Sequence, residues 1–237
     1  RRAVIEPLVK SAFGKTLGEI EIEVDKTMTP FVGHLEGWRI KGSASLLQEK
    51  ANVKNVIGVM EGRGSLKDET VIVGAHYDHL GYGGRGSLAP WTMDIHNGAD
   101  DNSSGTTGMM EIASLVAAAD SKNRRRVVFI AFSAEERGLI GSSFYVNNPL
   151  FNLSNTVAMI NLDMIGRLVD GDVQLTGQDS GSNFQEILQG VDADSPLNIR
   201  TGKSLSSRSD HASFYDKRIP VLFFTETVFA DEYHTPD

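Results

Sequence analysis

The segment VIVGAHYDHLG at residues 71–81 places three potential metal ligands within four positions, directly after a run of apolar residues. These ligands are His76, Asp78 and His79. Imidazole nitrogens and carboxylate oxygens suit a catalytic zinc or a similar divalent ion better than a structural zinc. The chain contains no cysteine, which excludes disulfides, thiol nucleophiles and cysteine-bound zinc. The segment therefore suggests a metal site, but it leaves open which of the three side chains binds the metal.

Further candidate ligands lie at or near the ends of other apolar segments. They are Asp100, Asp101, Glu135, Glu136, Asp163 and His234. With His76, and with each adjacent acidic pair counted once, these positions supply three carboxylates and two histidines, which are too many protein ligands for one open catalytic metal. They suit two metals, with one carboxylate bridging both and one histidine and one carboxylate on each. Two divalent ions, three carboxylates and a shared hydroxide would then sum to zero net charge.

The apolar segments that carry these residues are predicted to be buried strands alternating with helices. Strands are expected at 53–62, 69–76, 126–134, 156–166, 172–177 and 219–225, and helices at 107–119, 138–148, 181–190 and 209–216. Such alternation predicts an α/β fold, with a central mixed, mostly parallel β-sheet and helices on both faces. Because sites in these sheets gather at the carboxyl ends of the strands, we expect His76, Glu135, Glu136 and Asp163 to lie together.

Two other regions do not follow this alternation. Residues 81–105 are rich in glycine and lack periodicity, and long loops of this kind are commonly functional. Residues 1–50 begin with two short amphipathic helical patterns, broken by Pro7, Gly14 and Gly18. We predict an N-terminal lead-in at 1–50 and a larger domain at 51–237.

Composition excludes several classes of function. The net charge is −8 and the pI is near 5.3, so a nucleic-acid partner is not expected, because such partners require lysine and arginine to neutralise phosphates. The basic cluster at 124–126 is predicted to be the solvated entry to a strand. No apolar run approaches the roughly 18–20 residues that a membrane span needs, so we predict no membrane span.

Six motifs, taken in order, resemble the co-catalytic di-zinc aminopeptidases of the bacterial leucyl aminopeptidase type. They are GAHYDHLG, NGADDNSSG, SAEERGLIGS, NLDMIGR, SRSDHASF and YHTPD. The wider superfamily includes glutamate carboxypeptidase II and glutaminyl cyclase. The resemblance covers residues 52–237 and implies the zinc-exopeptidase fold, of the phosphorylase/hydrolase-like type.

Carried over residue by residue, the resemblance implies two Zn²⁺ ions per chain, with other divalent ions possible. It implies that His76 and Asp163 bind one zinc, that Glu136 and His234 bind the other, and that Asp101 bridges the two. Asp100 is interpreted as a loop residue. The resemblance also implies a cis peptide bond between Asp101 and Asn102, which is rare for a non-proline residue.

Glu135 is then predicted to be the general base. Adjacent residues at a strand end cannot both point at one metal, so Glu136 is expected to coordinate while Glu135 faces the attacking hydroxide and passes its proton to the leaving amine. The alternative is two solvated glutamates at a helix start.

Tyr233 and Arg208 match positions that in some family members hold the tetrahedral intermediate or the substrate, and an ordinary packing or surface role is the alternative for each.

Asp78 follows His76 by two residues and should lie on the same side of an extended chain. We expect its carboxylate to accept the second ring N–H of His76 and so to fix the tautomer. His79 should lie on the opposite side and is assigned no role. His96 is interpreted as a loop residue, with lining of the cleft as the alternative.

The predicted function is a metal-dependent exopeptidase that removes N-terminal amino acids from peptides with a free N-terminus, through a metal-bridging hydroxide and a glutamate base. A carboxypeptidase or a glutaminyl cyclase on the same site is the alternative. A non-catalytic binding domain is less favoured because every expected ligand is present. The resemblance implies a secreted or periplasmic protein, a catalytic domain that continues past Asp237, and an N-terminal segment resembling the exit from a protease-associated domain. The sequence predicts neither side-chain specificity nor oligomeric state.

Overall fold

A computed structural model describes residues 2–39, 41–45, 50–192, 196–202 and 204–236 of the chain. The chain divides into two compact units, residues 1–50 and 51–237. Among the helices that the structure describes, none combines the length and the apolar character needed to cross a bilayer.

The N-terminal unit contains two helices, α1 (Arg2–Phe13) and α2 (Leu17–Thr27). The expected break at Pro7 is wrong, because α1 continues through this residue and ends before Gly14, which has a φ of +67°. Proline removes only the hydrogen bond to the carbonyl of Ala3, and Ala3 is exposed, so water can take the place of that donor.

The expected break at Gly18 is also wrong, because this residue lies in the first turn of α2. Thr16 and Glu19 form a reciprocal cap at the start of the helix. The Thr16 hydroxyl accepts from the Glu19 amide at 3.1 Å, and the Glu19 carboxylate accepts from the Thr16 amide at 2.7 Å. This capping box satisfies free amides of the first turn, so the helix starts at Leu17 despite the glycine that follows.

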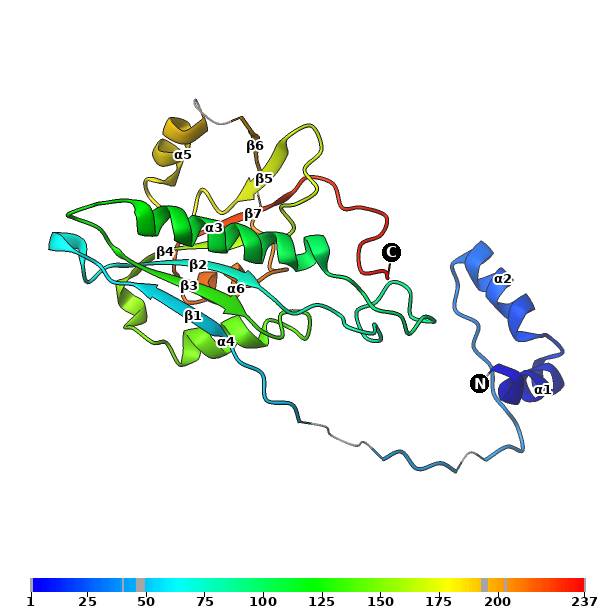
Figure 1. Cartoon of the computed structure of the whole chain (residues 1–237). Helices are drawn as coiled ribbons and strands as arrows, with labels where there is room; N and C mark the ends of the chain where they lie inside the picture. Colours follow the sequence, from blue (N-terminus) through cyan, green and yellow to red (C-terminus); the bar gives the residue numbers. More distant parts are fainter. Residues whose placement is uncertain (1, 40, 46–49, 193–195, 203, 237) are drawn as a thin grey trace. The chain divides into compact units, whose positions relative to one another are not determined.

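The second unit is built on a seven-stranded sheet in the order β1-β3-β2-β4-β7-β5-β6 (Figure 1). The strands are β1 (Val56–Met60), β2 (Thr70–His76), β3 (Arg126–Phe132), β4 (Thr156–Leu162), β5 (Asp172–Thr176), β6 (Asn198–Thr201) and β7 (Val221–Glu226). Strands β3, β2, β4 and β7 are parallel, as are β5 and β6. Strand β1 pairs antiparallel with β3, and β5 pairs antiparallel with β7. The predicted mixed, mostly parallel sheet is therefore confirmed.

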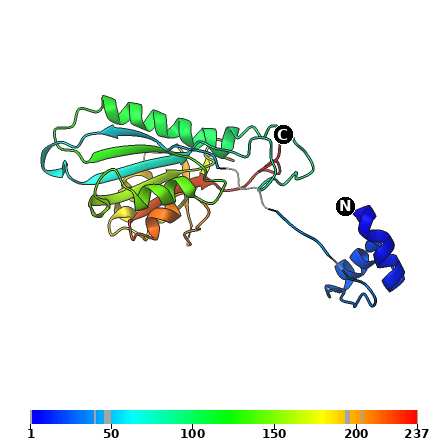
Figure 2. The same cartoon turned by 90° about the horizontal axis from the view of Figure 1, so that it is seen from below.

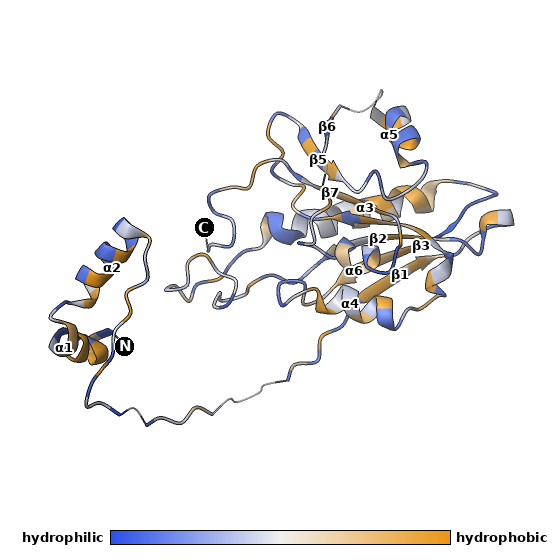
Figure 3. Ribbon diagram, turned by 180° about the vertical axis from the view of Figure 1, so that it is seen from behind, coloured by the Kyte–Doolittle hydropathy of each residue, from blue (hydrophilic) through white to orange (hydrophobic). Residues whose placement is uncertain are grey.

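Helices cover both faces of this sheet, as Figures 1 and 2 show. They are α3 (Gly105–Ala118), α4 (Ile140–Asn147), α5 (Phe184–Asp192) and α6 (His211–Tyr215). Ile72 and Val128 pack in one core cluster with residues of α4 and α6, whereas Val73 and Phe129 pack in another with Met109 of α3. Because successive strand side chains point to opposite faces, both faces need apolar residues. The central strands are accordingly coloured hydrophobic in Figure 3.

The parallel strands align their carboxyl ends at one edge of the sheet. Strand β2 ends at His76, which pairs in register with Phe132 at the end of β3. The loop at 77–98 and the segment after β7 leave from this same edge (Figure 1), and they contact each other where the Leu88 amide donates to the His234 carbonyl at 2.9 Å. The fold therefore gathers strand ends, a long loop and the C-terminal segment in one place.

A turn of π-helix, Ala99–Ser104, leads into α3. Asp101 and Asn102 within it have non-helical backbone angles, and the peptide bond between them is cis, as the resemblance implied. Ser104 occupies the N-cap position of α3 but makes no capping bond through its side chain. The Gly105 amide instead donates to the Asn102 side chain at 3.0 Å. The helix start is thus held by the buried Asn102 rather than by a serine.

Candidate metal centre

Seven potential ligands gather at the carboxyl edge of the sheet in two groups. One group is His76, Glu135 and Asp163, and the other is His79, Asp101, Glu136 and His234; within each group the ligand atoms lie within 4.8 Å of one another. The five residues that the sequence analysis predicted to bind metal, together with Glu135, therefore lie close together. His79 joins them, although no role was expected for it.

His76 is the buried centre of the first group. Its Nε2 atom lies 3.2 Å from Oδ1 of Asp101 and 3.3 Å from Oδ1 of Asp163. Burial lowers the pKa of His76, but hydrogen bonds to Asp101 and Asp163 raise it and prevail, so the pKa lies well above its usual range. The negative charge that favours a proton on this ring would also favour a divalent cation beside it.

The second ring nitrogen of His76 fixes its orientation. Nδ1 lies 3.0 Å from the main-chain carbonyl oxygen of Asp78, and 3.9 Å from the Asp78 carboxylate. The prediction that the carboxylate is the acceptor is therefore wrong, because the main-chain oxygen of the same residue takes that place. Donation from Nδ1–H to a carbonyl leaves Nε2 free to bind a metal.

The Asp78 carboxylate instead holds the two glutamates. It accepts the main-chain N–H of Glu135 at 3.0 Å and that of Glu136 at 3.4 Å. These amides follow a sharp turn at Ala134, which has a left-handed φ of 58°, and the turn points both amides toward the loop that carries Asp78. One carboxylate thus sets the position of two consecutive residues.

The two glutamates diverge, with Glu135 in the first group and Glu136 in the second. Glu135 is 9% exposed. Burial raises its pKa to about 9; the charge of His76 opposes this shift, and the charges of Asp163, Asp210 and Glu136 add to it. A divalent cation at the neighbouring ligands would act in the same direction as His76 and lower this pKa.

Asp101 joins the two groups. Its Oδ1 atom faces Nε2 of His76 at 3.2 Å, and its Oδ2 atom faces Nε2 of His234 at 3.1 Å. Burial raises the pKa of Asp101, but the hydrogen bonds from His234 and His76 outweigh burial and hold that pKa well below its usual range. Asp101 therefore offers one oxygen to each half of the centre.

His234 comes from the segment after β7. Its Nε2 atom also lies 3.5 Å from Oε2 of Glu136, and its Nδ1 atom lies 2.8 Å from the carbonyl oxygen of Gly86. Burial lowers the pKa of His234, but the hydrogen bond to Asp101 and the charge of Glu136 raise it above its usual value. The ring is thus held between a loop carbonyl and the carboxylates of the centre.

The sequence pattern assigns no role to His79, because alternation along an extended chain after His76 places it on the opposite side. The strand ends at His76, the chain turns, and the His79 ring faces inward. Its Nδ1 atom lies 2.7 Å from Oε1 of Glu136 and 3.9 Å from Oδ2 of Asp101. The signal in the sequence was the spacing of two histidines by three residues, which suits a turn as well as a strand.

The cleft beside the second group has a volume of about 270 Å³ and is lined by His79, 97–101, Met164, Arg167, Ala230 and 232–235. Tyr233 lines it and stacks on the His234 ring with centroids 3.9 Å apart. Burial, helped by the charge of Asp101, raises the pKa of the Tyr233 hydroxyl, which therefore keeps its proton. Arg208 is exposed and is not among the lining residues that the structure describes.

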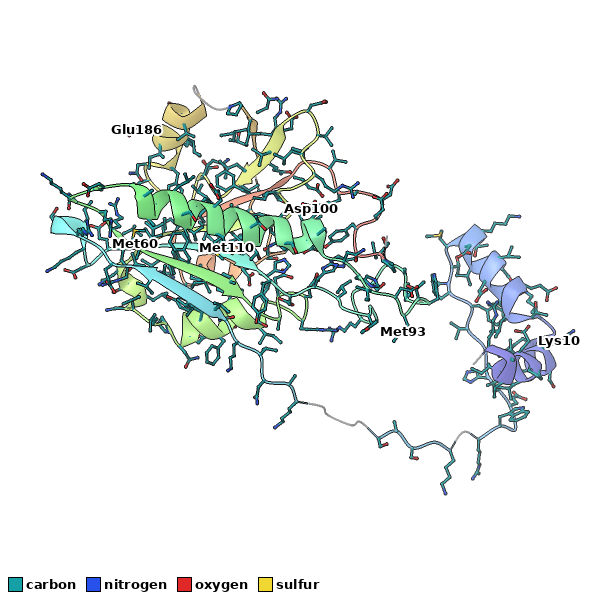
Figure 4. All side chains as sticks on the ribbon, in the orientation of Figure 1. Lys10, Met60, Met93, Asp100, Met110 and Glu186 are labelled. Carbon is teal, nitrogen blue, oxygen red and sulfur yellow. The ribbon has the colours of Figure 1, made fainter. Side chains whose placement is uncertain are left out.

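Three further acids surround the centre. Asp100, labelled in Figure 4 near the start of α3, accepts the Gly166 amide at 2.7 Å, so this loop residue has a structural contact. Burial and then the charge of Asp100 raise the pKa of Glu226 to about 7. Asp210 is fully buried, and burial raises its pKa to about 7. The adjacent His211 stacks on Phe223, and its Nε2 atom lies 2.6 Å from the carbonyl oxygen of Ser206.

The donor set fits two zinc ions, because it provides imidazole nitrogens and carboxylate oxygens in two groups joined by Asp101. Within each group the donor atoms are close enough to surround one ion. The buried carboxylates also provide the negative charge that two divalent cations would balance.

Comparison with known proteins gives consistent matches. The model of peptidase family M28 matches residues 55–237. Aminopeptidase YwaD of Bacillus subtilis (strain 168) is 30% identical over 224 residues, covering 83% of this chain and 44% of the relative. Among solved structures, BSAP, a zinc aminopeptidase from Bacillus subtilis, is 30% identical with a TM-score of 0.60, covering 77% and 43% of the two chains. The aminopeptidase from Aneurinibacillus sp. strain AM-1 is 28% identical with a TM-score of 0.59, covering 77% and 41%. The chain spans less than half the length of these relatives.

Proposed function

The chain belongs to peptidase family M28, and from that premise we propose that it is a zinc-dependent aminopeptidase that removes N-terminal amino acids from peptides. The observation that carries this proposal is the placement of Asp101 between the two histidines. One of its oxygens lies 3.2 Å from Nε2 of His76 and the other 3.1 Å from Nε2 of His234. A carboxylate in that position is suited to bridge two ions.

In this proposal His76 and Asp163 would hold one ion, Glu136 and His234 would hold the other, and Asp101 would serve both. When bound, the two zinc ions would polarise the scissile carbonyl and acidify the attacking water. The hydrogen bond from Nδ1 of His79 to Oε1 of Glu136 orients this carboxylate, as outer partners of metal ligands commonly do.

Glu135 is the proposed general base. Its side chain lies in the first group, whereas the side chain of Glu136 lies in the second, and Asp78 accepts the main-chain amides of both residues. With divalent cations bound nearby, the raised pKa of Glu135 would fall, and its carboxylate would accept the proton of the attacking water and then donate it to the nitrogen of the leaving amine. The Tyr233 hydroxyl lines the cleft and keeps its proton, so we propose that it donates to the carbonyl oxygen of the substrate. We propose no role in the chemistry for Arg208.

The charges along the cleft favour a substrate with a free amino group. Asp100 lines it and forms no ion pair with a cation among the described residues, so its carboxylate would attract an ammonium group. A carboxypeptidase would need a free cation for the terminal carboxylate, but the lining arginine, Arg167, is paired with Glu232 at 3.3 Å. A secreted or periplasmic location is proposed from the family resemblance alone.

A combined metal and substrate analysis tests this function. We expect two zinc ions per chain by elemental analysis, and hydrolysis of aminoacyl-4-nitroanilides that stops when the α-amino group is acetylated. Cleavage of only acylated substrates, or release of C-terminal residues, would contradict the aminopeptidase assignment. Cyclisation of N-terminal glutamine without hydrolysis would instead identify a glutaminyl cyclase.

A further inference from the structure

His234 reaches the metal centre from a segment that contains no helix or strand among the residues described after β7. One turn of the 77–98 loop holds both its ring and its main chain. The ring Nδ1–H donates to the carbonyl of Gly86 at 2.8 Å, and the His234 carbonyl accepts from the amide of Leu88 at 2.9 Å. The backbone of His234 has a left-handed φ of 56°, so the chain itself does not favour this conformation.

Ser87 lies between the two residues that hold His234, and His96 holds Ser87. The His96 side chain is 3% exposed. Its Nδ1 atom donates to the carbonyl of Asp94 at 3.0 Å, so in the neutral ring Nε2 is an acceptor. The Ser87 hydroxyl lies 2.8 Å from that Nε2 atom, donates to it, and accepts the amide of Ala89 at 3.0 Å.

The surroundings of His96 leave its ring little freedom. Its own amide donates to the carbonyl of Gly81 at 2.7 Å. A Cβ atom at Gly83, where φ is +84°, would lie 2.6 Å from Cε1 of His96, so the ring packs against main chain that only glycine can provide. Both ring nitrogens are engaged within the loop, and His96 is in neither group of ligands. Met93, labelled in Figure 4, marks the exposed part of the same loop.

We propose that His96 is a positioning residue for the metal centre, which acts through Ser87 and the turn at 86–88 to fix His234. This inference rests on the proposed function, because it takes His234 to be a zinc ligand. Holding Ser87 fixes the Gly86 carbonyl and the Leu88 amide on either side of it, and these are the two groups that bind His234. The Ser87 hydroxyl oxygen itself lies 3.4 Å from the His234 carbonyl. The effect should therefore be confined to the half of the centre that contains His234.

The test measures zinc affinity of the full chain by competition with a chromophoric chelator, independently of peptidase activity. His96→Phe keeps an aromatic ring against Gly83 but removes both ring hydrogen bonds. Ser87→Ala removes one hydroxyl and should not disturb folding. For each variant we expect one zinc to bind as in wild type and the second to bind about tenfold more weakly, because outer partners of metal ligands typically contribute about 10- to 100-fold to affinity. His34→Gln, at an exposed histidine of the N-terminal unit, is the matched control and should leave both affinities unchanged.

Two further variants separate positioning from packing. The Ser87→Ala/His96→Phe double variant should bind the second zinc only slightly more weakly than the weaker of the two single variants. The reason is that both substitutions remove the same hydrogen bond between Ser87 and His96. In His96→Gln the amide oxygen of the glutamine can still accept a hydrogen bond from Ser87. This variant should therefore bind the second zinc nearly as tightly as the wild type does. A purely structural role would not give this recovery.

The possible results are distinct. Unchanged second-site affinity in both single variants overturns the positioning role and leaves the proposed function intact. Equal weakening of both zinc sites also overturns it, because the effect would then not act through His234. If His96→Phe fails to fold, Ser87→Ala alone decides. A wild-type chain that binds fewer than two zinc ions overturns the proposed function and, with it, this inference.

Discussion

The two halves of the candidate metal centre are held in different ways. His76 and Asp163 lie at the end of β2 and directly after β4, whereas His79 and His234 lie on loops and are fixed by hydrogen bonds to other segments. Glu135 and Glu136, one from each group, both follow β3. The side chain of His76 is 1% exposed, and that of His234 is 12% exposed. The sheet therefore places one half through its core packing, while the other half depends on a few polar contacts.

This difference predicts different responses to substitution. A change in the strand-built half should affect folding as well as chemistry, because its residues are part of a close-packed edge. A change in the loop-built half should affect metal affinity with little effect on folding, because hydrogen bonds near the surface contribute about 1 kcal/mol each.

Glu135→Gln should have the largest effect. We expect kcat to fall by about 10²- to 10⁴-fold, the usual contribution of a general base, because the amide cannot accept a proton. The zinc content should be unchanged, since Glu135 is not one of the proposed ligands. Kinetics with an aminoacyl-4-nitroanilide and elemental analysis of the same sample check this. Near-normal turnover would show that another group is the base.

Asp210→Asn tests how much the buried charge of Asp210, near the strand-built half of the centre, lowers the free energy of unfolding. The pKa of folded Asp210 is about 7, above its ordinary 3.8, so folding favours the protonated form. The contribution of Asp210 to the stability of the wild type is then greatest below about pH 4 and is lost as pH rises through 7. The variant stays neutral and should be more stable than wild type at pH 8, by up to about 4 kcal/mol.

Urea unfolding of chelator-treated samples at pH 5 and pH 8 measures this effect. The advantage of Asp210→Asn should be about 1–2 kcal/mol at pH 5 and should rise to about 4 kcal/mol at pH 8. An advantage that does not change with pH would mean that Asp210 is not the group responsible.

His76→Ala and His234→Ala compare the two halves directly. In the presence of chelator, His76→Ala should lower the free energy of unfolding by about 2–4 kcal/mol, because it leaves a cavity and unpaired buried carboxylates. His234→Ala should lower it by about 1 kcal/mol or less. Denaturant unfolding of both variants provides the measurement, and equal losses would show that the halves are not differently supported.

His79→Asn should have the smallest effect. It shortens the side chain that binds Oε1 of Glu136, so we expect one zinc to bind about three- to tenfold more weakly, near the lower limit for an outer partner. Competition with a chelator measures this affinity. Complete loss of one zinc would instead identify His79 as a ligand.

Periodicity and strand-end position were sufficient to predict the sheet and most of its strands. The apolar strands β2 (70–76) and β3 (126–132) are largely buried on both faces, and such strands have a clear pattern. Strand β6, with the sequence NIRT, was missed because it is short, polar and mostly exposed at the sheet edge. Pro7 was overvalued as a helix breaker because a single lost hydrogen bond at an exposed position can be replaced by water.

The sequence located the side chains of the metal centre better than it predicted their contacts. Asp78 and His79 were assigned by alternation along an extended chain, but the strand ends at His76. Which atom of Asp78 accepts from His76 depends on the turn after the strand, and that turn is set by contacts with Glu135 and Glu136, far away in the sequence. Residue type and spacing do not contain that information.

The two hydrogen bonds that the Asp78 carboxylate accepts from consecutive amides also limit how the positions of Glu135 and Glu136 can change. Because one carboxylate binds the main-chain amides of both glutamates, the backbones of Glu135 and Glu136 move together. A backbone shift that carries one of them forward must carry the other. Moving the carboxylate of Glu135 without moving Glu136 would therefore require a side chain of different length at position 135. A change in the conformation of the loop would move both residues.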